Sequence, residues 1–227
     1  VFYLEPSHID LEEVVVSVPG GKLQSENIVN IERKKLSEIT HASTSLAEAI
    51  TSIPGVNQLA TGPGIGKPII RGLSGNRIVT YSQGIRVENQ QWGDEHGLGI
   101  AEPGVESVEV IKGPASLLYG ADAMGGVLYF VDERYARHNE MEGAFNTRFL
   151  SNTLGTYSDL GLKIHKEAFK MNVFGGYTSN ADYMVPKDNR VLNSRFDEKS
   201  IKTSLGYNTK KWISNIRYSY LQNAFGI

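Results

Sequence analysis

A short polar stretch in the middle of the chain holds the residue types best suited to bind a ligand. Residues 90–97 read QQWGDEHG and offer amide, indole, carboxylate and imidazole groups, from Gln91, Trp92, Asp94, Glu95 and His96. Zinc accepts carboxylate oxygens and imidazole nitrogens, but three adjacent residues rarely reach one ion without partners elsewhere. We therefore treat Asp94, Glu95 and His96 as a candidate metal site. An ordinary solvated loop and a contact to an organic ligand are the alternatives.

No stretch carries a complete catalytic pattern. Residues 62–68, GPGIGKP, fail as a phosphate-binding loop because Thr61 stands where the first glycine is needed and Pro68 replaces the required serine or threonine. Residues 72–76, GLSGN, fail as a nucleophile elbow because Asn76 replaces the final glycine. We therefore expect that the protein is not an enzyme and has no cofactor, so that any bound metal or metal complex would be cargo.

The composition narrows the class of partner. The chain has 23 basic and 25 acidic residues, and this balance gives no broad positive field for a phosphate backbone, so nucleic acid is not an expected partner. Cysteine is absent, which excludes disulfides and thiolate metal sites. No apolar run approaches the roughly 18 residues that a transmembrane helix needs. The composition is compatible with transmembrane β-strands, because the alternating apolar and polar residues of such strands average out to a polar composition.

Residues 1–137 read as a mixed α+β domain of short elements. A helix is predicted over residues 44–52, with Thr44 as its cap and Pro54 beyond its end, and a second short helix over residues 116–119. Short apolar runs between turns predict strands, at residues 69–70, 78–81, 85–87, 105–111 and 127–131.

From residue 138 to 227 the pattern predicts antiparallel β-strands. Apolar and polar residues alternate in five segments, at residues 145–149, 160–165, 169–178, 201–207 and 212–220, although Phe174 has the wrong parity. The connections alternate in length, with short turns at 167–168 and 208–211 and a long polar loop at 179–198. This asymmetry is typical of outer-membrane barrels, which have short periplasmic turns and long external loops.

A soluble sheet with one solvated face would show the same alternation. The aromatic content favours a membrane, because tyrosine and tryptophan gather in girdles at membrane interfaces. The candidates for such girdles are Tyr157, Tyr177, Tyr207, Trp212, Tyr218 and Tyr220.

Three ordered motifs resemble the plug domain of TonB-dependent outer-membrane receptors. They are SLAEAITSIPGV at residues 45–56, IIRGLSGNRIVTYSQGIRVEN at 69–89 and VESVEVIKGPASLLYGADAMGGVLY at 105–129. One departure is the turn Gln83-Gly84, where the family usually has Asp-Gly. The polar loop at 90–97, together with LQNAFGI near residue 227, resembles the branch of the family associated with zinc or haem uptake.

The resemblance implies a TonB box near the amino end. Residues 12–18, EEVVVSV, resemble that segment, which places the box at Glu13, Val14, Val15, Val16, Ser17 and Val18. Such a segment would add as a strand to an edge of TonB, so that main-chain hydrogen bonds supply the affinity. The alternative is that the valines form the first strand of the plug. The resemblance also implies that Arg71 and Arg77 form ion pairs with barrel glutamates, and the alternative is ordinary surface arginines.

The resemblance further implies a plug over residues 1–137 and the first strands of a barrel over residues 138–227. A lumen that holds such a plug needs about 22 strands, so five strands are an incomplete barrel. The expected function is TonB-dependent uptake of a metal ion, siderophore, haem or similar ligand across the outer membrane of a Gram-negative cell. The expected partners are TonB, with ExbB and ExbD as its energy source, and outer-membrane lipid; a surface lipoprotein or the barrel-assembly machinery stay open. The alternatives are a receptor that captures or signals without transport, and a barrel caught during assembly or export.

Overall fold

The computed structural model describes residues 31–41, 43–88, 97–187 and 189–226. The proposed TonB box, Glu13 to Val18, and the candidate ligand residues Gln91, Trp92, Asp94, Glu95 and His96 lie outside the described residues. None of the helices in the described ranges is long and apolar enough to cross a membrane.

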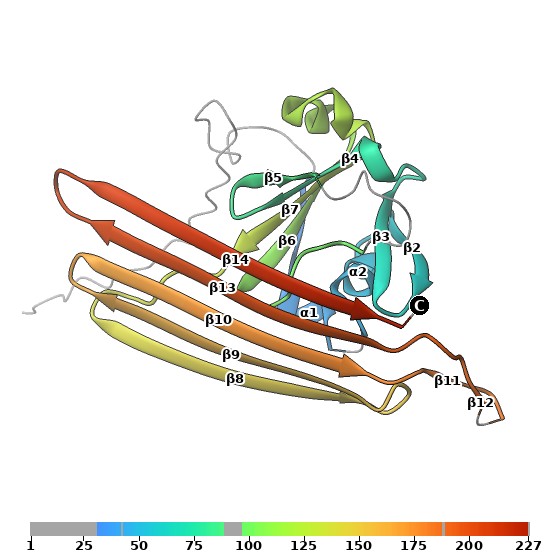
Figure 1. The fold of residues 1–227 in the computed structure, drawn as a ribbon. Helices are drawn as coiled ribbons and strands as arrows, with labels where there is room; N and C mark the ends of the chain where they lie inside the picture. Colours follow the sequence, from blue (N-terminus) through green and yellow to red (C-terminus); the bar gives the residue numbers. More distant parts are fainter. Residues whose placement is uncertain (1–30, 42, 89–96, 188, 227) are drawn as a thin grey trace, which may run out of the picture. The chain divides into compact units, whose positions relative to one another are not determined.

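The first part of the described chain forms a five-stranded mixed sheet, in the order β1-β6-β7-β4-β5 (Figure 1). The strands are β1 (Ile31–Lys35), β4 (Ile78–Ser82), β5 (Ile85–Val87), β6 (Val105–Ile111) and β7 (Gly126–Asp132). Strand β7 pairs antiparallel with β6 and parallel with β4. A separate hairpin consists of β2 (Val56–Gly62) and β3 (Ile65–Ile70). We call residues 31–132 the plug unit, after the predicted resemblance.

Short helices connect these strands, namely α1 (Leu36–Ile39), α2 (Leu46–Ala49), η2 (Ile50–Ser52), η3 (Gly75–Arg77), η5 (Gly113–Tyr119) and η6 (Ala121–Met124). The predicted helix over residues 44–52 is thus split into α2 and η2, and its cap is Ser45 rather than Thr44. The Ser45 hydroxyl accepts a hydrogen bond from the backbone N–H of Glu48 (3.3 Å), and the Glu48 carboxylate accepts one from that of Thr44 (2.7 Å). The Glu48 carboxylate thus reaches one residue further back than in a capping box, in which it would bind the N–H of the cap residue itself.

Strands β6 and β7 carry the core of the plug unit. Val108, Val110, Leu128 and Phe130 are each at most 1% exposed, because helices and the β2–β3 hairpin supply further apolar side chains around the sheet. The additional core residues include Leu46, Ile50, Ile53, Val56, Ile70 and Ile78. Strand β7, GVLYFVD, has a near-continuous apolar run, as is typical of strands that are buried on both faces.

The second part forms a sheet of five long antiparallel strands in the order β14-β13-β10-β9-β8 (Figure 1). The strands are β8 (Glu140–Leu150), β9 (Gly155–Lys166), β10 (Phe169–Asn180), β13 (Phe196–Asn208) and β14 (Ile213–Phe225). We call this sheet the wall. The long loop after β10 contains the two-stranded pair β11 (Met184–Val185) and β12 (Asn189–Arg190). The predicted boundary after residue 137 falls between β7 and β8. The predicted fold class is confirmed, and the described strands do not close into a barrel.

The two faces of the wall have different neighbours. One face carries large exposed apolar side chains, among them Phe145, Phe149, Leu160, Tyr177, Ile201, Tyr207, Ile216, Tyr218 and Tyr220. The opposite face meets the plug unit, and this explains the wrong parity of Phe174, which is buried close to Gly104. Tyr157 also lies on this inner face, where it is 7% exposed. Its assignment to an interfacial girdle is therefore wrong, because the Arg148 guanidinium covers its ring at 4.0 Å.

Candidate functional site

The turn Glu102-Pro103-Gly104, just before β6, is a point at which the wall and the plug unit are joined by buried ion pairs and close apolar contacts. The Glu102 carboxylate forms an ion pair with Arg148 of β8 at 2.8 Å, and both side chains are mostly buried. The same guanidinium donates a hydrogen bond to the Thr40 carbonyl at 2.5 Å. Arg148 therefore joins two separate segments of the plug unit to the first wall strand.

A lysine of β13 makes the second polar contact with this turn. Lys202, only 5% exposed, lies with its Nζ 2.5 Å from Asp132 at the end of β7 and 3.4 Å from the Gly104 carbonyl. Glu133, which follows Asp132 in the chain, forms an ion pair with Lys163 of β9 at 3.2 Å. In the described residues, the wall thus supplies the bases and the plug side supplies the acids.

Apolar contacts fill the space between these ion pairs. A Cβ placed on Gly104 would lie 2.5 Å from a ring carbon of Phe174, and one placed on Gly176 would lie 2.5 Å from the Pro103 ring. Glycine at positions 104 and 176 therefore permits the close approach of turn and strand. Gly104 also has φ of +72°, a conformation that other residues adopt only with strain.

The buried position changes the acid–base behaviour of Glu102. Burial raises the pKa of its carboxyl group above the ordinary value, while the charge and hydrogen bond of Arg148 oppose that rise. The ion pair thus counteracts an unfavourable environment for the Glu102 charge.

The two arginines predicted to pair with barrel glutamates lie elsewhere. Arg71 and Arg77 are exposed on the plug unit, and neither forms an ion pair with the wall strands that the structure describes. Their pairing stays a prediction about barrel residues outside the described strands. Basic wall residues paired with acidic plug residues could not be predicted, because Arg148 and Lys202 look like ordinary inward-facing polar positions of alternating strands.

Gln83 and Gly84, which stand where the family usually has Asp-Gly, form a tight hairpin turn between β4 and β5. Gln83 has φ of +56° and Gly84 has φ of +77°, as a type I′ turn requires. Arg217 of β14 donates a hydrogen bond to the Gln83 carbonyl at 2.8 Å. This wall contact uses the backbone, so the exchange of the usual aspartate for glutamine leaves it in place.

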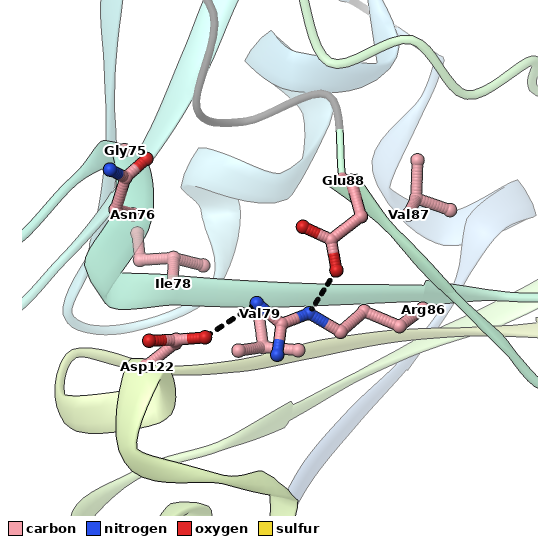
Figure 2. Close-up of a pocket in the computed structure, with 8 residues that line it drawn as sticks. All are labelled: Gly75, Asn76, Ile78, Val79, Arg86, Val87, Glu88 and Asp122. Carbon is pink, nitrogen blue, oxygen red and sulfur yellow. Dashed lines mark hydrogen bonds and ion pairs between the residues drawn. The ribbon is translucent and has the colours of Figure 1, made fainter.

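A small polar pocket lies on the plug unit beside this hairpin (Figure 2). It has a volume of about 150 Å³ and is lined by residues of η3, β4, β5 and η6. Arg86 crosses it and forms ion pairs with Glu88 at 2.9 Å and with Asp122 at 2.7 Å. The ion pair between Arg86 and Asp122 thus ties β5 to η6 across the pocket.

Two crevices flank the turn between β2 and β3, the stretch GPG that is no phosphate-binding loop. One, of about 360 Å³, has polar walls that include Glu48, Thr61, Asn152 and Tyr183. The other, of about 520 Å³, is more apolar and includes Pro63, Ile65, Arg195, Phe196 and Phe225. Both lie at the end of the wall that carries the long loop.

Gly97 connects this end of the molecule with the predicted ligand loop. A Cβ on Gly97 would lie 3.3 Å from the Gly64 carbonyl, so the chain returns to the β2–β3 turn directly after residues 90–96. The two crevices are candidate ligand surfaces that the sequence reasoning missed. A Gly-Pro-Gly turn between two short strands was the available signal.

Comparison with known proteins decides the family. Residues 22–127 match the TonB-dependent receptor plug domain. This segment of the chain belongs to the plug-domain family of the TonB-dependent receptors. The chain is placed in the outer membrane, where such receptors lie, and the exposed apolar face of the wall is suited to lipid.

Individual relatives agree with this assignment. The chain is 37% identical over 97 residues to the heme/hemopexin utilization protein C of Haemophilus influenzae, covering 42% of this chain and 13% of that protein. It is 32% identical over 88 residues to the vitamin B12 transporter BtuB of Photobacterium profundum, covering 38% and 14%. The structure of the copper transporter OprC superposes with a TM-score of 0.69 at 20% identity, covering 85% of this chain and 30% of that one. The chain thus spans less than a third of the length of each.

Proposed function

We propose that the chain is part of a receptor that actively takes up a scarce ligand across the outer membrane without breaking any bond in it. The observation that carries the proposal is a family plug domain held against the wall by polar contacts. The relatives are named for haem, vitamin B12 and copper, which supports a metal ion, siderophore, haem or similar ligand as the cargo class.

The coupling partner in this proposal is TonB, energised through ExbB and ExbD. Residues Glu13 to Val18 would act as the TonB box by adding a strand to the TonB domain. In cells that carry the full gene, Val15→Pro should reduce uptake of haemin or cyanocobalamin at least about tenfold, because proline removes a main-chain donor. Val15→Thr keeps the donor and the β-branch and should transport normally.

The outcome of that experiment separates uptake from capture alone. Both variants must first be shown to insert and to bind the probe as the parent does. Equal uptake by Val15→Pro and Val15→Thr would remove the coupling role of this segment. Binding without uptake in the parent, with TonB present, would favour a receptor that captures or signals.

Ligand contact is proposed for the polar loop and for the crevices beside the β2–β3 turn. In the loop, Gln91, Trp92, Asp94, Glu95 and His96 would face the ligand, with the last three as metal ligands. Metal analysis of the purified full receptor after incubation with Zn²⁺ tests this directly: His96→Ala should lose bound zinc, with His41→Ala as a control. Equal zinc content in both would exclude the loop as a metal site.

Arg71 and Arg77 have a separate place in the proposal. Their exposure on the plug unit suits ion pairs with acidic barrel residues beyond the described strands. Solvated pairs of this kind are individually weak, so they would hold the plug while permitting its release.

A further inference from the structure

The contacts between the plug unit and the wall differ in burial. In the Glu102–Arg148 pair the side chains are 16% and 19% exposed, and in the Asp132–Lys202 pair they are 21% and 6% exposed. The contact of β14 with the plug unit is different, because Arg217 donates a hydrogen bond to the Gln83 carbonyl at an exposed position. The wall therefore holds the plug unit through buried ion pairs at the 102–104 turn and through an exposed hydrogen bond at the β4–β5 hairpin.

This difference in burial predicts a difference in strength. Removing one partner of a buried ion pair leaves a desolvated charge, which is strongly destabilising. An exposed pair exchanges its partner for water at little cost. Phe174 and Pro103 add apolar packing at the buried turn, and the β4–β5 turn has no comparable apolar contact among the described residues.

The buried turn also lies at a particular end of the sheet. Gly104 directly precedes β6, and its carbonyl accepts a hydrogen bond from the Glu133 N–H just after β7 (3.0 Å). Strand β1 begins at the other end of β6, where Ile31 is paired with Ile111. Seven residues of extended strand, about 24 Å at roughly 3.4 Å each, separate the turn from the point where residues 1–30 join the sheet.

We propose that the Glu102-Pro103-Gly104 turn is an anchor that keeps the β6–β7 end of the plug unit on the wall when the exposed contacts open. A pull on residues 1–30 would then act at the far end of β6 and loosen β1 before it loosens the anchor. That second statement rests on the proposed function, whereas the anchoring itself is independent of it.

Hydrogen exchange measured by mass spectrometry on the full-length receptor in lipid tests the anchor without any cargo. Arg148→Ala removes the partner of Glu102, and the amides of residues 97–111 should exchange on the order of 100-fold faster. Arg217→Ala is the matched control, since it removes an arginine that also bridges wall and plug. It should accelerate exchange in residues 78–88 by less than about fivefold and leave residues 97–111 unchanged.

A second variant covers the case in which Arg148→Ala fails to insert. Lys202→Gln keeps most of the side-chain length, removes the charge beside Asp132, and should also accelerate exchange in residues 97–111. Equal effects of the Arg217 variant and the anchor variants on residues 97–111 would overturn the proposal, as would an unchanged exchange rate in both anchor variants. A parent receptor that shows no TonB-dependent uptake would contradict the proposed function and leave these exchange results standing.

Discussion

Replacing Gly104 by alanine should weaken the hold of the wall on the plug unit by two separable effects. The φ of +72° at Gly104 is a left-handed conformation, which costs an L-residue about 1–2 kcal/mol. The added methyl group would also lie 2.5, 2.9 and 3.0 Å from three ring carbons of the buried Phe174. Such overpacking typically costs about 1–3 kcal/mol, so we expect a total loss of about 2–5 kcal/mol.

The chain offers a control that isolates the backbone effect. Gly72 has φ of +81°, and a Cβ there meets nothing within 4 Å. Gly72→Ala should therefore cost only the backbone strain, about 1–2 kcal/mol. The free energy of local opening, obtained from hydrogen exchange of residues 97–111 for Gly104 and of residues 69–80 for Gly72, gives the two costs in the same full-length receptor.

A double variant tests the steric effect directly. Phe174→Ala alone should cost about 3–5 kcal/mol, as truncation of a buried aromatic side chain usually does. Because it removes the ring that the new methyl group would meet, Gly104→Ala should cost about 1–3 kcal/mol less in the Phe174→Ala background. Equal costs of the Gly104 and Gly72 variants, or strict additivity with Phe174→Ala, would refute the close-contact reasoning.

Three further predictions concern other parts of the structure. Burial raises the pKa of Glu102, so the contribution of this group to stability is complete below its unfolded-state pKa and is lost as pH rises through its folded-state pKa. The free energy of local opening of residues 97–111, obtained from hydrogen exchange after correction for the intrinsic exchange rate at each pH, should therefore depend less on pH in Glu102→Gln than in the parent. Ile201→Lys places a charge near the middle of β13 on the exposed face and should cost about 2–4 kcal/mol in folding into lipid vesicles, and a cost near zero would contradict the lipid-facing assignment. Ser45→Ala removes the cap of α2 and should cost about 1 kcal/mol, measured by exchange of residues 46–52, whereas Thr44→Val should cost less if Ser45 is the cap.

The local patterns in the sequence carried much of the fold. The alternation of apolar and polar residues can be read within a short segment of sequence, so all five wall strands could be predicted. The Gly-rich motifs marked the turns of the plug unit. Strand β1 was missed, because IERKK has no apolar alternation and pairs with β6 through its backbone. The cap of α2 was displaced by one residue because Thr44 and Ser45 are both good caps.

The contacts between the two parts could not be predicted, because they join residues far apart in the chain. Arg148 and the Thr40 carbonyl are 108 positions apart, and Lys202 and Gly104 are 98 apart. An inward-facing lysine or arginine in an alternating strand gives no sign of its partner. Phe174 was the one local signal, since a large apolar residue on the polar face indicates that something apolar lies against it.

The strand order of the mixed sheet also restricts the sequence of events during folding. Strand β7 lies in the middle of the sheet yet is the last of its five strands in the chain, so β4 and β6 cannot be joined until residue 132 has been delivered. Pairing β4 with β7 closes a loop of more than forty residues, a slow and non-local step.

The residues that grip the 102–104 turn come later still, from β8, β10 and β13. All strands of the plug sheet therefore precede, in the chain, the wall residues that hold the 102–104 turn. In a chain made from its amino end, Glu102 therefore exists before its partner Arg148, and the anchor can form only after β8 has followed the plug sheet.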